Sequence, residues 1–467
     1  MTARPGAAPP LDRNRLARLE ARELERFAAA HPRSKALHER AKAHLVSGVP
    51  MPWMVKWAGR FPIYVESAEG AHLRCVDGHD YVDLSLGDTG AMSGHGAPAT
   101  LDAIRDQLAR GLTHMLPTED AAIVGAELAR RFGVPAWQFT LSATDANRFA
   151  LRLARAITRR PKVLVFDWCY HGTVDETFAV LEPAPHGSGS AGQRVVPRRG
   201  SVGPQVDVAA TTRVVEFNDV EALEAALLPG DVAAVLAEPA MTNIGIVLPD
   251  PGFHDALREV TRRTGTLLVI DETHTLCAGP GGYTGVFGLE PDVVVVGKTI
   301  GGGVPIGAYG LSRELADRVD EVVGVEDSDV GGIGGTLAGN ALSLAAARAT
   351  LASVLTDAAF DRMIPLAERW TDGVESVLEA RSVPWHVTRL GCRAEYHFLP
   401  QAPRTGAEAA AASDVPLERY LHLAALNRGI LLTPFHNMAL MSPVTTADDV
   451  DRHTAIFDEV VGELFGG

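Results

Sequence analysis

The sequence of 467 residues has few cysteines, and they are not clustered. Cys75, Cys169, Cys277 and Cys392 lie far apart and lack the spacing of a metal or redox site. Free thiols of this kind suit a reducing compartment, so we expect a cytoplasmic protein. The remaining composition, with 46% hydrophobic and 22% charged residues, is ordinary for a globular enzyme.

Long apolar runs and basic runs are also missing. No stretch approaches the roughly 18 consecutive apolar residues of a membrane span, and residues 1–5 lack the apolar core of a signal peptide. The 43 basic residues are outnumbered by 58 acidic ones, which gives a net charge of −15. These features argue against membrane and nucleic-acid partners and favour small molecules as substrates.

Apolar runs alternate with helical patterns between residues 100 and 345. Four runs of strand length lie there, at 163–166, 232–236, 267–270 and 293–296. Helical patterns such as 220–228 and 253–264 separate them. Runs that are apolar at every position indicate strands covered on both faces. The pattern predicts the α/β class, with a mostly parallel sheet between helices.

The flanking segments show different patterns. Residues 11–45 predict one or two amphipathic helices that break near Pro32. Short strands are expected near 61–65, 72–83 and 393–398, the second containing an Asp-Gly hairpin turn. We therefore expect an N-terminal helical segment at 1–45, a smaller α+β domain formed by 46–99 and 346–467, and a large domain at 100–345.

Polar residues follow the carboxyl ends of the four apolar runs, where ligands bind in parallel α/β sheets. They are Asp167, Glu238, Asp271 and Lys298. A lysine buried at such a position tends to lose its proton, and its neutral amine then attacks carbonyl groups. A carboxylate at a neighbouring strand end can hold a ring nitrogen. Asp271 and Lys298 together therefore suit a pyridine aldehyde cofactor.

Several shorter motifs allow two interpretations. Residues 142–146, Ser-Ala-Thr-Asp-Ala, open a helical stretch at 147–158 and suit a phosphate, although an ordinary helix cap explains them equally well. Gly335-Thr336 is either a second anion seat or a flexible turn. Asp271 and His274 suggest a metal site, but the spacing supplies no third ligand.

Two nucleotide-binding motifs are absent. Gly297-Lys298-Thr299 is not a phosphate-binding P-loop, because its glycines follow the lysine instead of preceding it. No Gly-x-Gly-x-x-Gly opens a helix after a strand, which argues against a nicotinamide dehydrogenase.

Taken together, these residues resemble the ordered signature of class III aminotransferases, which are pyridoxal-phosphate enzymes of fold type I. The resemblance runs from about residue 45 to the C-terminus. It is strongest to the subgroup of glutamate-1-semialdehyde aminomutase and the amine and β-amino-acid transaminases. The matching residues are Ser142 to Ala146, Tyr170-His171-Gly172, Glu238-Pro239, Asp271-Glu272, Lys298 and Gly335-Thr336.

The resemblance implies pyridoxal 5'-phosphate as the cofactor and assigns roles to these residues. Lys298 would hold the aldehyde as a Schiff base and shuttle a proton, while Asp271 would keep the ring nitrogen protonated. Tyr170 would stack on the ring, and Thr336 would reach the phosphate from a second subunit of a homodimer or a dimer of dimers. The expected cofactor-binding residues are Ser142, Ala143, Thr144, Tyr170, His171, Glu238, Asp271, Thr273, His274, Lys298 and Thr336.

The substrate-binding positions differ from those of the known relatives. The arginines of β-amino-acid transaminases are missing from residues 47–54 and 434–437, and Asp88 replaces an aromatic residue of the aminomutase. Met51 and its neighbours form either an aromatic, apolar pocket or packing against the N-terminal helices. The carboxylate of a keto acid needs a cation, for which Arg393 is the first candidate and Arg60 the second. The expected substrate-binding residues are Trp53, Met54, Trp57, Asp88 and Arg393.

The expected reaction is amino-group transfer from a hydrophobic or aryl amine or amino acid to a keto acid such as pyruvate, by ping-pong chemistry. The alternatives are an intramolecular 2,1-aminomutase of the glutamate-1-semialdehyde type, and a pyridoxal-phosphate-dependent racemase or decarboxylase. A regulatory module that binds the cofactor without catalysis is a further alternative, but the sequence has no DNA-binding segment or basic arm.

Overall fold

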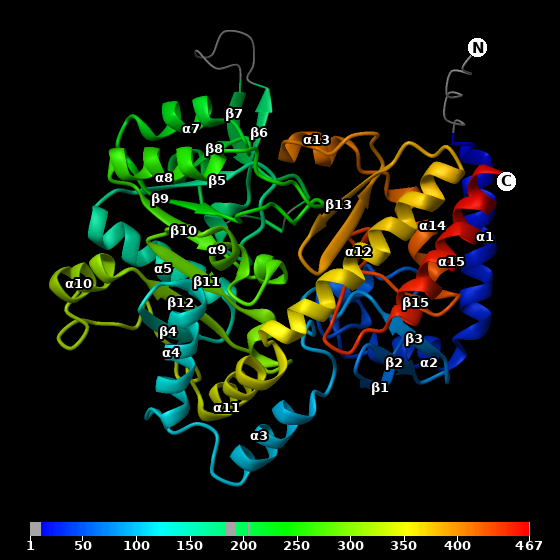
Figure 1. The fold of residues 1–467 in the computed structure, drawn as a ribbon, viewed down its shortest axis with the longest axis horizontal. Coiled ribbons are helices and arrows are strands. Elements are labelled where there is room, and N and C mark those ends of the chain that lie inside the picture. Colours follow the sequence, from blue (N-terminus) through cyan, green and yellow to red (C-terminus); the bar gives the residue numbers. More distant parts are fainter. Residues whose placement is uncertain (1–10, 184–192, 201, 204–205, 467) are drawn as a thin grey trace. The chain divides into compact units, whose positions relative to one another are not determined.

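The computed structural model describes residues 11–183, 193–200, 202–203 and 206–466. Figure 1 shows the chain coloured along the sequence. It divides into two compact units, of which unit 1 comprises Met1–Ala97, Ala358–Ala402 and Ala412–Gly467, and unit 2 comprises Pro98–Asp357 and Pro403–Ala411. No helix in the described ranges combines the length and apolarity that crossing a membrane requires. The first ten residues of the expected N-terminal segment lie outside the described residues.

Unit 2 is built on a seven-stranded sheet (Figure 1). In spatial order the strands are β4 (Ala136–Thr140), β12 (Gly307–Leu311), β11 (Val293–Val296), β10 (Leu267–Asp271), β9 (Val232–Ala237), β5 (Lys162–Phe166) and β8 (Thr212–Val215). β12 pairs antiparallel with both β11 and β4, and the other neighbouring strands pair in parallel. The predicted α/β fold with a mostly parallel sheet is therefore confirmed.

Every residue of β9, β10, β11 and β12 is buried, which indicates that both faces of this sheet are covered. Helix α5 (Ala143–Thr158) packs against β4, β9, β11 and β12, while α8 (Phe253–Thr264) packs against β10. The other helical elements of the unit are α3 (Pro98–Leu108), α4 (Glu119–Phe132), η3 (Asp175–Thr177), α6 (Val208–Thr211), α7 (Val220–Leu227), η4 (Thr275–Ala278), α9 (Gly282–Phe287), η5 (Lys298–Gly301), α10 (Arg313–Val322), α11 (Ala341–Ala349), the π-helical turn η6 (Thr350–Val354) and α13 (Gly406–Ala411). A hairpin of β6 (Ala179–Pro183) and β7 (Gln193–Pro197) completes it.

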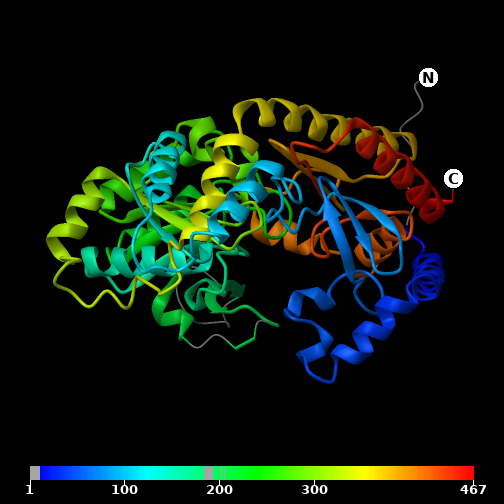
Figure 2. The ribbon, with the colours of Figure 1, turned by 90° about the horizontal axis from the view of Figure 1, so that it is seen from below.

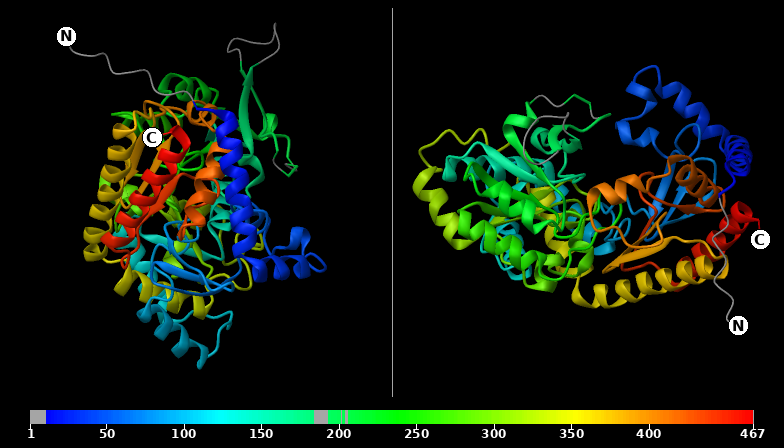
Figure 3. Two further views of the ribbon diagram at one scale, coloured as in Figure 1. Left: turned by 90° about the vertical axis from the view of Figure 1, so that its right-hand side faces the viewer. Right: turned by 90° about the horizontal axis from the view of Figure 1, so that it is seen from above.

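Unit 1 contains two smaller sheets. One has the order β1 (Val65–Glu69), β2 (His72–Cys75), β3 (Asp80–Asp83) and β15 (Ile430–Leu431), and the other β13 (His386–Leu390), β14 (Arg393–His397) and β16 (Met438–Leu440). Its helices are α1 (Arg13–Ala30), α2 (Pro32–Ala41), η1 (Val46–Gly48), η2 (Pro52–Val55), α12 (Asp357–Ala380), α14 (Val415–Leu426) and α15 (Ala447–Phe465). Helices α1, α14 and α15 lie side by side, as Figures 2 and 3 also show.

The predicted helix break at Pro32 is confirmed, since α1 ends at Ala30 and α2 begins at Pro32. The predicted strand at 61–65 is wrong, because β1 begins only at Val65. Phe61 and Ile63 instead pack with Phe27 of α1. Their apolar side chains therefore serve the core beneath the N-terminal helix and not a sheet.

Candidate active site

Lys298 leaves the sheet directly after β11 and Gly297, at the first residue of η5. Its φ of 50° lies in the left-handed region, a backbone conformation that is strained for a non-glycine residue. The side chain is half-buried. Its Nζ lies 2.7 Å from Nε2 of His274, so the amine is held by a hydrogen bond.

Asp271 ends the neighbouring strand β10 and pairs in register with Val295 of β11, so Asp271 and Lys298 leave the sheet at one edge. The Asp271 carboxylate is buried and accepts four hydrogen bonds. They come from Asn147 Nδ2 at 2.8 Å, His171 Nδ1 at 2.9 Å, Thr273 N at 3.1 Å and Thr273 Oγ1 at 2.6 Å.

These hydrogen bonds decide the charge of Asp271. Burial by itself raises the pKa of the carboxyl group, but the bonds from His171, Thr273 and Asn147 outweigh burial and hold its pKa below the ordinary value. Asp271 is therefore a stable anion inside the unit. Such an anion can keep a proton on a pyridine nitrogen.

His171, in the loop after β5, is the charged partner of Asp271. Burial lowers its pKa, but the neighbouring Cys169 and Asp271 more than compensate and raise the pKa of His171 to about 10. Its Nε2 is buried and has no hydrogen-bond partner among the described residues. The ring therefore both fixes Asp271 and leaves one N–H available to a bound group.

Glu238 follows β9 and is buried, and its Oε2 accepts hydrogen bonds from the backbone N–H of Thr242 at 3.0 Å and from its hydroxyl. Burial raises the pKa of Glu238, which favours the neutral acid. Asp167, at the end of β5, instead accepts a hydrogen bond from Leu181 N of β6 at 3.1 Å. Of the four strand-end residues, Asp167 is therefore bound to the β6–β7 hairpin.

The expected phosphate seat lies at the start of α5. Ser142 is its N-cap, and its hydroxyl accepts from Asp145 N at 3.2 Å. Thr144 Oγ1 accepts from Thr173 N at 3.1 Å. Gly172 packs so closely here that a Cβ would lie 2.0 Å from Thr144 Oγ1. The first N–H groups of a helix have no partner within it, so this turn fits a phosphate.

Two further cofactor residues lie in unit 2. The half-buried ring of Tyr170 lies edge-on to Phe178, with ring centroids 6.4 Å apart. Thr336 is exposed, in the segment between α10 and α11. Their assignments to ring stacking and to the phosphate of a second subunit stay predictions.

The expected substrate residues all belong to unit 1. The Trp53 ring meets Phe435 edge-on, with centroids 5.6 Å apart, and both side chains are 38% exposed. Met54 is exposed as well, whereas Trp57 packs against the core that contains Phe27, which supports the packing alternative for this residue. Asp88 has a left-handed backbone, with a φ of 53°.

Arg393 is fully buried on β14, and its Nη2 lies 3.1 Å from Oε2 of Glu395. His436 Nδ1 lies 3.2 Å from the other oxygen of Glu395. Burial raises the pKa of Glu395, but His436 and Arg393 lower it to about 2. A role for Arg393 with a substrate carboxylate stays a prediction, and that carboxylate would compete with Glu395.

Sequence analysis missed two residues that orient the site. Asn147 donates to Asp271, and Thr242 donates to Glu238. Asn147 could have been noticed as a polar residue among Ala146, Ala150 and Leu151 on the buried face of α5. Thr242 gave no signal, because only the folded turn brings it to Glu238.

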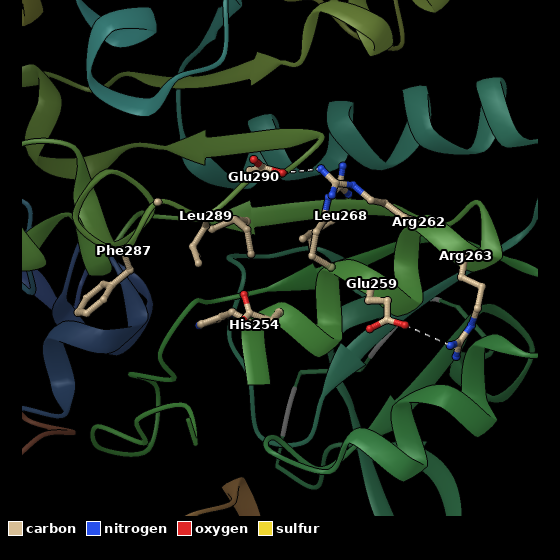
Figure 4. Close-up of a pocket in the computed structure, with 12 residues that line it drawn as sticks. His254, Glu259, Arg262, Arg263, Leu268, Phe287, Leu289 and Glu290 are labelled. Atoms are coloured by element: carbon tan, nitrogen blue, oxygen red, sulfur yellow. Dashed lines mark hydrogen bonds and ion pairs between the residues drawn. The ribbon is translucent and has the colours of Figure 1, made fainter. Parts of the chain in front are cut away.

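Unit 2 also has a pocket of about 620 Å³ between α8 and the segment that leads to β11 (Figure 4). Its arginines already pair with carboxylates: Arg262 with Glu290 at 2.5 Å, Arg263 with Glu259 at 3.7 Å and Arg258 with Asp292 at 2.8 Å. Lys298 and Asp271 do not line it. This pocket is therefore separate from the candidate active site.

A lysine and an aspartate anion at adjacent strand ends, beside a phosphate seat, define an enzyme that uses a pyridine aldehyde. The chain belongs to the class III aminotransferases: the family model described as Aminotransferase class-III matches residues 53–461. It is 34% identical over 440 residues to glutamate-1-semialdehyde 2,1-aminomutase 2 of Exiguobacterium sibiricum, covering 92% of this chain and 97% of the relative.

Solved structures of an aminomutase and of a transaminase are also similar to this chain. A glutamate-1-semialdehyde-aminomutase from Pseudomonas aeruginosa PAO1 is 52% identical, with a TM-score of 0.93 and coverage of 97% of this chain and 99% of that chain. A lysine-to-alanine variant, likewise 52% identical and with the same TM-score and coverage, is in complex with PMP. An omega-transaminase from Sphaerobacter thermophilus is 29% identical, with a TM-score of 0.83 and coverage of 93% and 98%.

Proposed function

We propose that the protein is a pyridoxal-phosphate enzyme that moves an amino group between two carbons of one substrate, as an intramolecular 2,1-aminomutase. The names of the Exiguobacterium and Pseudomonas relatives favour this alternative over the intermolecular transfer that the sequence first suggested. The observation that carries the proposal is the placement of Lys298 and Asp271 at one edge of adjacent strands. Amino transfer needs both groups.

The residues of unit 2 fit the cofactor. The start of α5 would hold its phosphate through the N–H groups of Ala143 and Thr144, and Asp271 would hold its ring nitrogen. Pyridoxal phosphate supplies an aldehyde that captures amines and a ring that withdraws electrons. His171 would keep Asp271 charged and oriented through their 2.9 Å hydrogen bond.

Lys298 has two tasks in this proposal. Its amine would hold the cofactor between reactions, and the amine when free would carry a proton between two carbons that are separated by one nitrogen. General acid–base catalysis of this kind contributes about 10²–10⁴-fold to rates. The left-handed backbone at Lys298 fixes the direction in which its side chain leaves the sheet.

An intermolecular transaminase is the second candidate, and the Trp53–Phe435 pair favours it. Two half-exposed aromatic rings in edge contact suit an aryl donor. In either case the proposed assembly is a homodimer in which Thr336 serves the partner's phosphate site. Solution scattering, with Thr336→Val tested for weaker cofactor binding, checks that arrangement.

The deciding experiment supplies two substrate systems to the purified protein. With glutamate-1-semialdehyde alone, the aminomutase moves nitrogen from carbon 2 to carbon 1 without an external acceptor. With an aryl amine and pyruvate, the transaminase forms alanine. Lys298→Ala is expected to lose both activities and the adduct that borohydride reduction traps, while Lys35→Ala, at an exposed position of α2, keeps them. An adduct on another lysine contradicts the proposal.

A further inference from the structure

His274 and Lys298 are the half-exposed positions of two otherwise buried segments. Residues 271–279 are buried apart from His274, and residues 293–301 are buried apart from Lys298. His274 follows the carboxyl end of β10 and Lys298 follows the carboxyl end of β11, and these two strands are parallel neighbours. Both side chains therefore emerge at one edge of the sheet, where Lys298 Nζ meets His274 Nε2 at 2.7 Å.

The turn that carries His274 is fixed on both sides. Before it, Thr273 donates its backbone N–H and its hydroxyl to Asp271. After it, the Thr275 hydroxyl donates to Glu272, which also accepts the backbone N–H groups of Tyr283 and Thr284. A ring carried by such a fixed turn is held in place against Lys298.

When a hydrogen bond joins two bases, the extra proton resides on one of them at a time. An ammonium N–H donates to a neutral imidazole, or an imidazolium donates to a neutral amine. Protonating both would put two positive charges 2.7 Å apart, which like-charge repulsion opposes. We propose that His274 is the proton partner of Lys298, and that it takes the proton which the lysine must lose before it can act as a base or nucleophile.

The step balances within the pair. The N–H bond at Lys298 Nζ breaks, its electron pair stays on Nζ, and the proton forms a new N–H bond at Nε2. The positive charge moves from the ammonium to the imidazole. No oxidant, reductant or other reactant is consumed, and the reverse transfer restores the ammonium.

The other titratable groups around this edge have partners of their own. Asp271 accepts four hydrogen bonds, Glu272 accepts three, His171 donates to Asp271 and Glu238 accepts from Thr242. The Tyr283 hydroxyl has its pKa raised to about 12 by burial and by Glu272, which keeps it neutral. His274, whose Nε2 contacts Lys298 Nζ at 2.7 Å, is placed to exchange a proton with the lysine directly.

This inference rests on the proposed capture of a pyridoxal aldehyde by Lys298, and one experiment separates the two. Full-length protein freed of cofactor is mixed with pyridoxal phosphate, and the growth of visible absorbance is followed from pH 6 to 9. Three proteins are compared: wild type, His274→Gln, whose amide oxygen still accepts a hydrogen bond but does not take up a proton, and His274→Ala. Mass spectrometry after borohydride reduction identifies the modified lysine.

At neutral pH we expect capture to be about 10²-fold slower in both variants, with a rate that rises steeply with pH. Free imidazole should restore the rate of His274→Ala, and the final occupancy should be unchanged. If His274 only filled space or held a hydrogen bond, His274→Gln would match wild type and imidazole would do nothing, which overturns the inference. If no protein forms an adduct at Lys298, the proposed function itself fails.

Discussion

Nδ1 of His171 lies 2.9 Å from Oδ2 of Asp271, and both side chains are buried. The lowered pKa of Asp271 and the raised pKa of His171 make them an ion pair at neutral pH. Removing one member of a buried pair leaves an uncompensated charge and costs about 3–5 kcal/mol. The pair therefore stabilises unit 2 and also keeps the carboxylate of Asp271 charged.

We expect His171→Gln to lower the thermal midpoint and to change its dependence on pH. The pKa of His171 rises on folding from about 6.5 to about 10, so its contribution is complete below the lower value and is lost as pH rises through the upper one. Wild type should lose stability between these values, and His171→Gln should lose less. Melting at pH 6 and pH 9.5 measures this.

The control for that comparison is His72→Gln. His72 pairs with Asp449 at 2.8 Å, but its side chain is 52% exposed, and exposed pairs contribute about 0–1 kcal/mol. It should melt like wild type at both pH values. Equal pH dependence in wild type and His171→Gln would contradict the ion pair.

Much of the sheet of unit 2 could be predicted from sequence. Four uninterrupted apolar runs gave β5, β9, β10 and β11, and the helix expected at 253–264 is α8 residue for residue. Strand β12 was missed, because Gly307 and Gly310 lower its strand propensity. A Cβ at Gly310 would lie 2.5 Å from the Trp137 ring, so this glycine is required by packing between strands and not by a local pattern.

The site was predictable only in part. Asp271 and Lys298 could be predicted because each lies at the carboxyl end of an apolar run. That pattern is visible without knowing which residues lie beside them in the fold. The contacts of Asp271 with Asn147 and His171 depend on how α5 and the loop after β5 meet the end of β10. No spacing in the sequence indicates those three-dimensional contacts, and the same holds for the contact between His274 and Lys298.

Gly172→Ala tests the phosphate seat. A Cβ at this position would lie 2.0 Å from Thr144 Oγ1, so the methyl group must displace the start of α5 or the loop. Losing one charge-assisted hydrogen bond to phosphate costs about 1.5–3 kcal/mol, or roughly tenfold or more in cofactor affinity. The dissociation constant for pyridoxal phosphate, measured by fluorescence titration, checks this.

Gly230→Ala is the matched control. Gly230 has a φ of 70°, close to the 76° of Gly172, but nothing lies within 4 Å of its added Cβ. It should show only the backbone cost of about 1–2 kcal/mol in stability, with unchanged cofactor affinity. If both variants bound the cofactor equally weakly, the strain of a left-handed backbone would explain the lost affinity, and not the close contact of Gly172 with Thr144.

Asp271→Asn tests the ring-nitrogen contact. The amide has nearly the same shape and its oxygen still accepts from Thr273, but it carries no charge to hold a proton on the ring. We expect cofactor to bind while the turnover rate falls about 10²-fold or more. Asp167→Asn at the end of β5, where the carboxylate accepts from Leu181, should retain full turnover. Equal rates in the two variants would contradict the role of Asp271.

The last prediction separates a substrate role of Arg393 from a structural one. Arg393→Met leaves the buried Glu395 without one of its cations, and breaking such a pair costs about 3–5 kcal/mol. The double variant Arg393→Met/Glu395→Leu removes both charges, and apolar replacement of a buried pair is often neutral or stabilising. We therefore expect the single variant to melt lower and the double variant to recover.

Substrate kinetics then decide the function of this arginine. If Arg393 binds the substrate carboxylate, KM for an acidic substrate stays raised in the double variant although its stability has returned. If Arg393 only supports unit 1, the Michaelis constant returns with the thermal midpoint. Because Glu395 also contacts His436 at 3.2 Å, His436→Phe in the double-variant background tests whether the charge of that histidine has replaced the arginine. A raised KM that persists in the stable double variant and does not change with His436→Phe assigns the carboxylate contact to Arg393 itself.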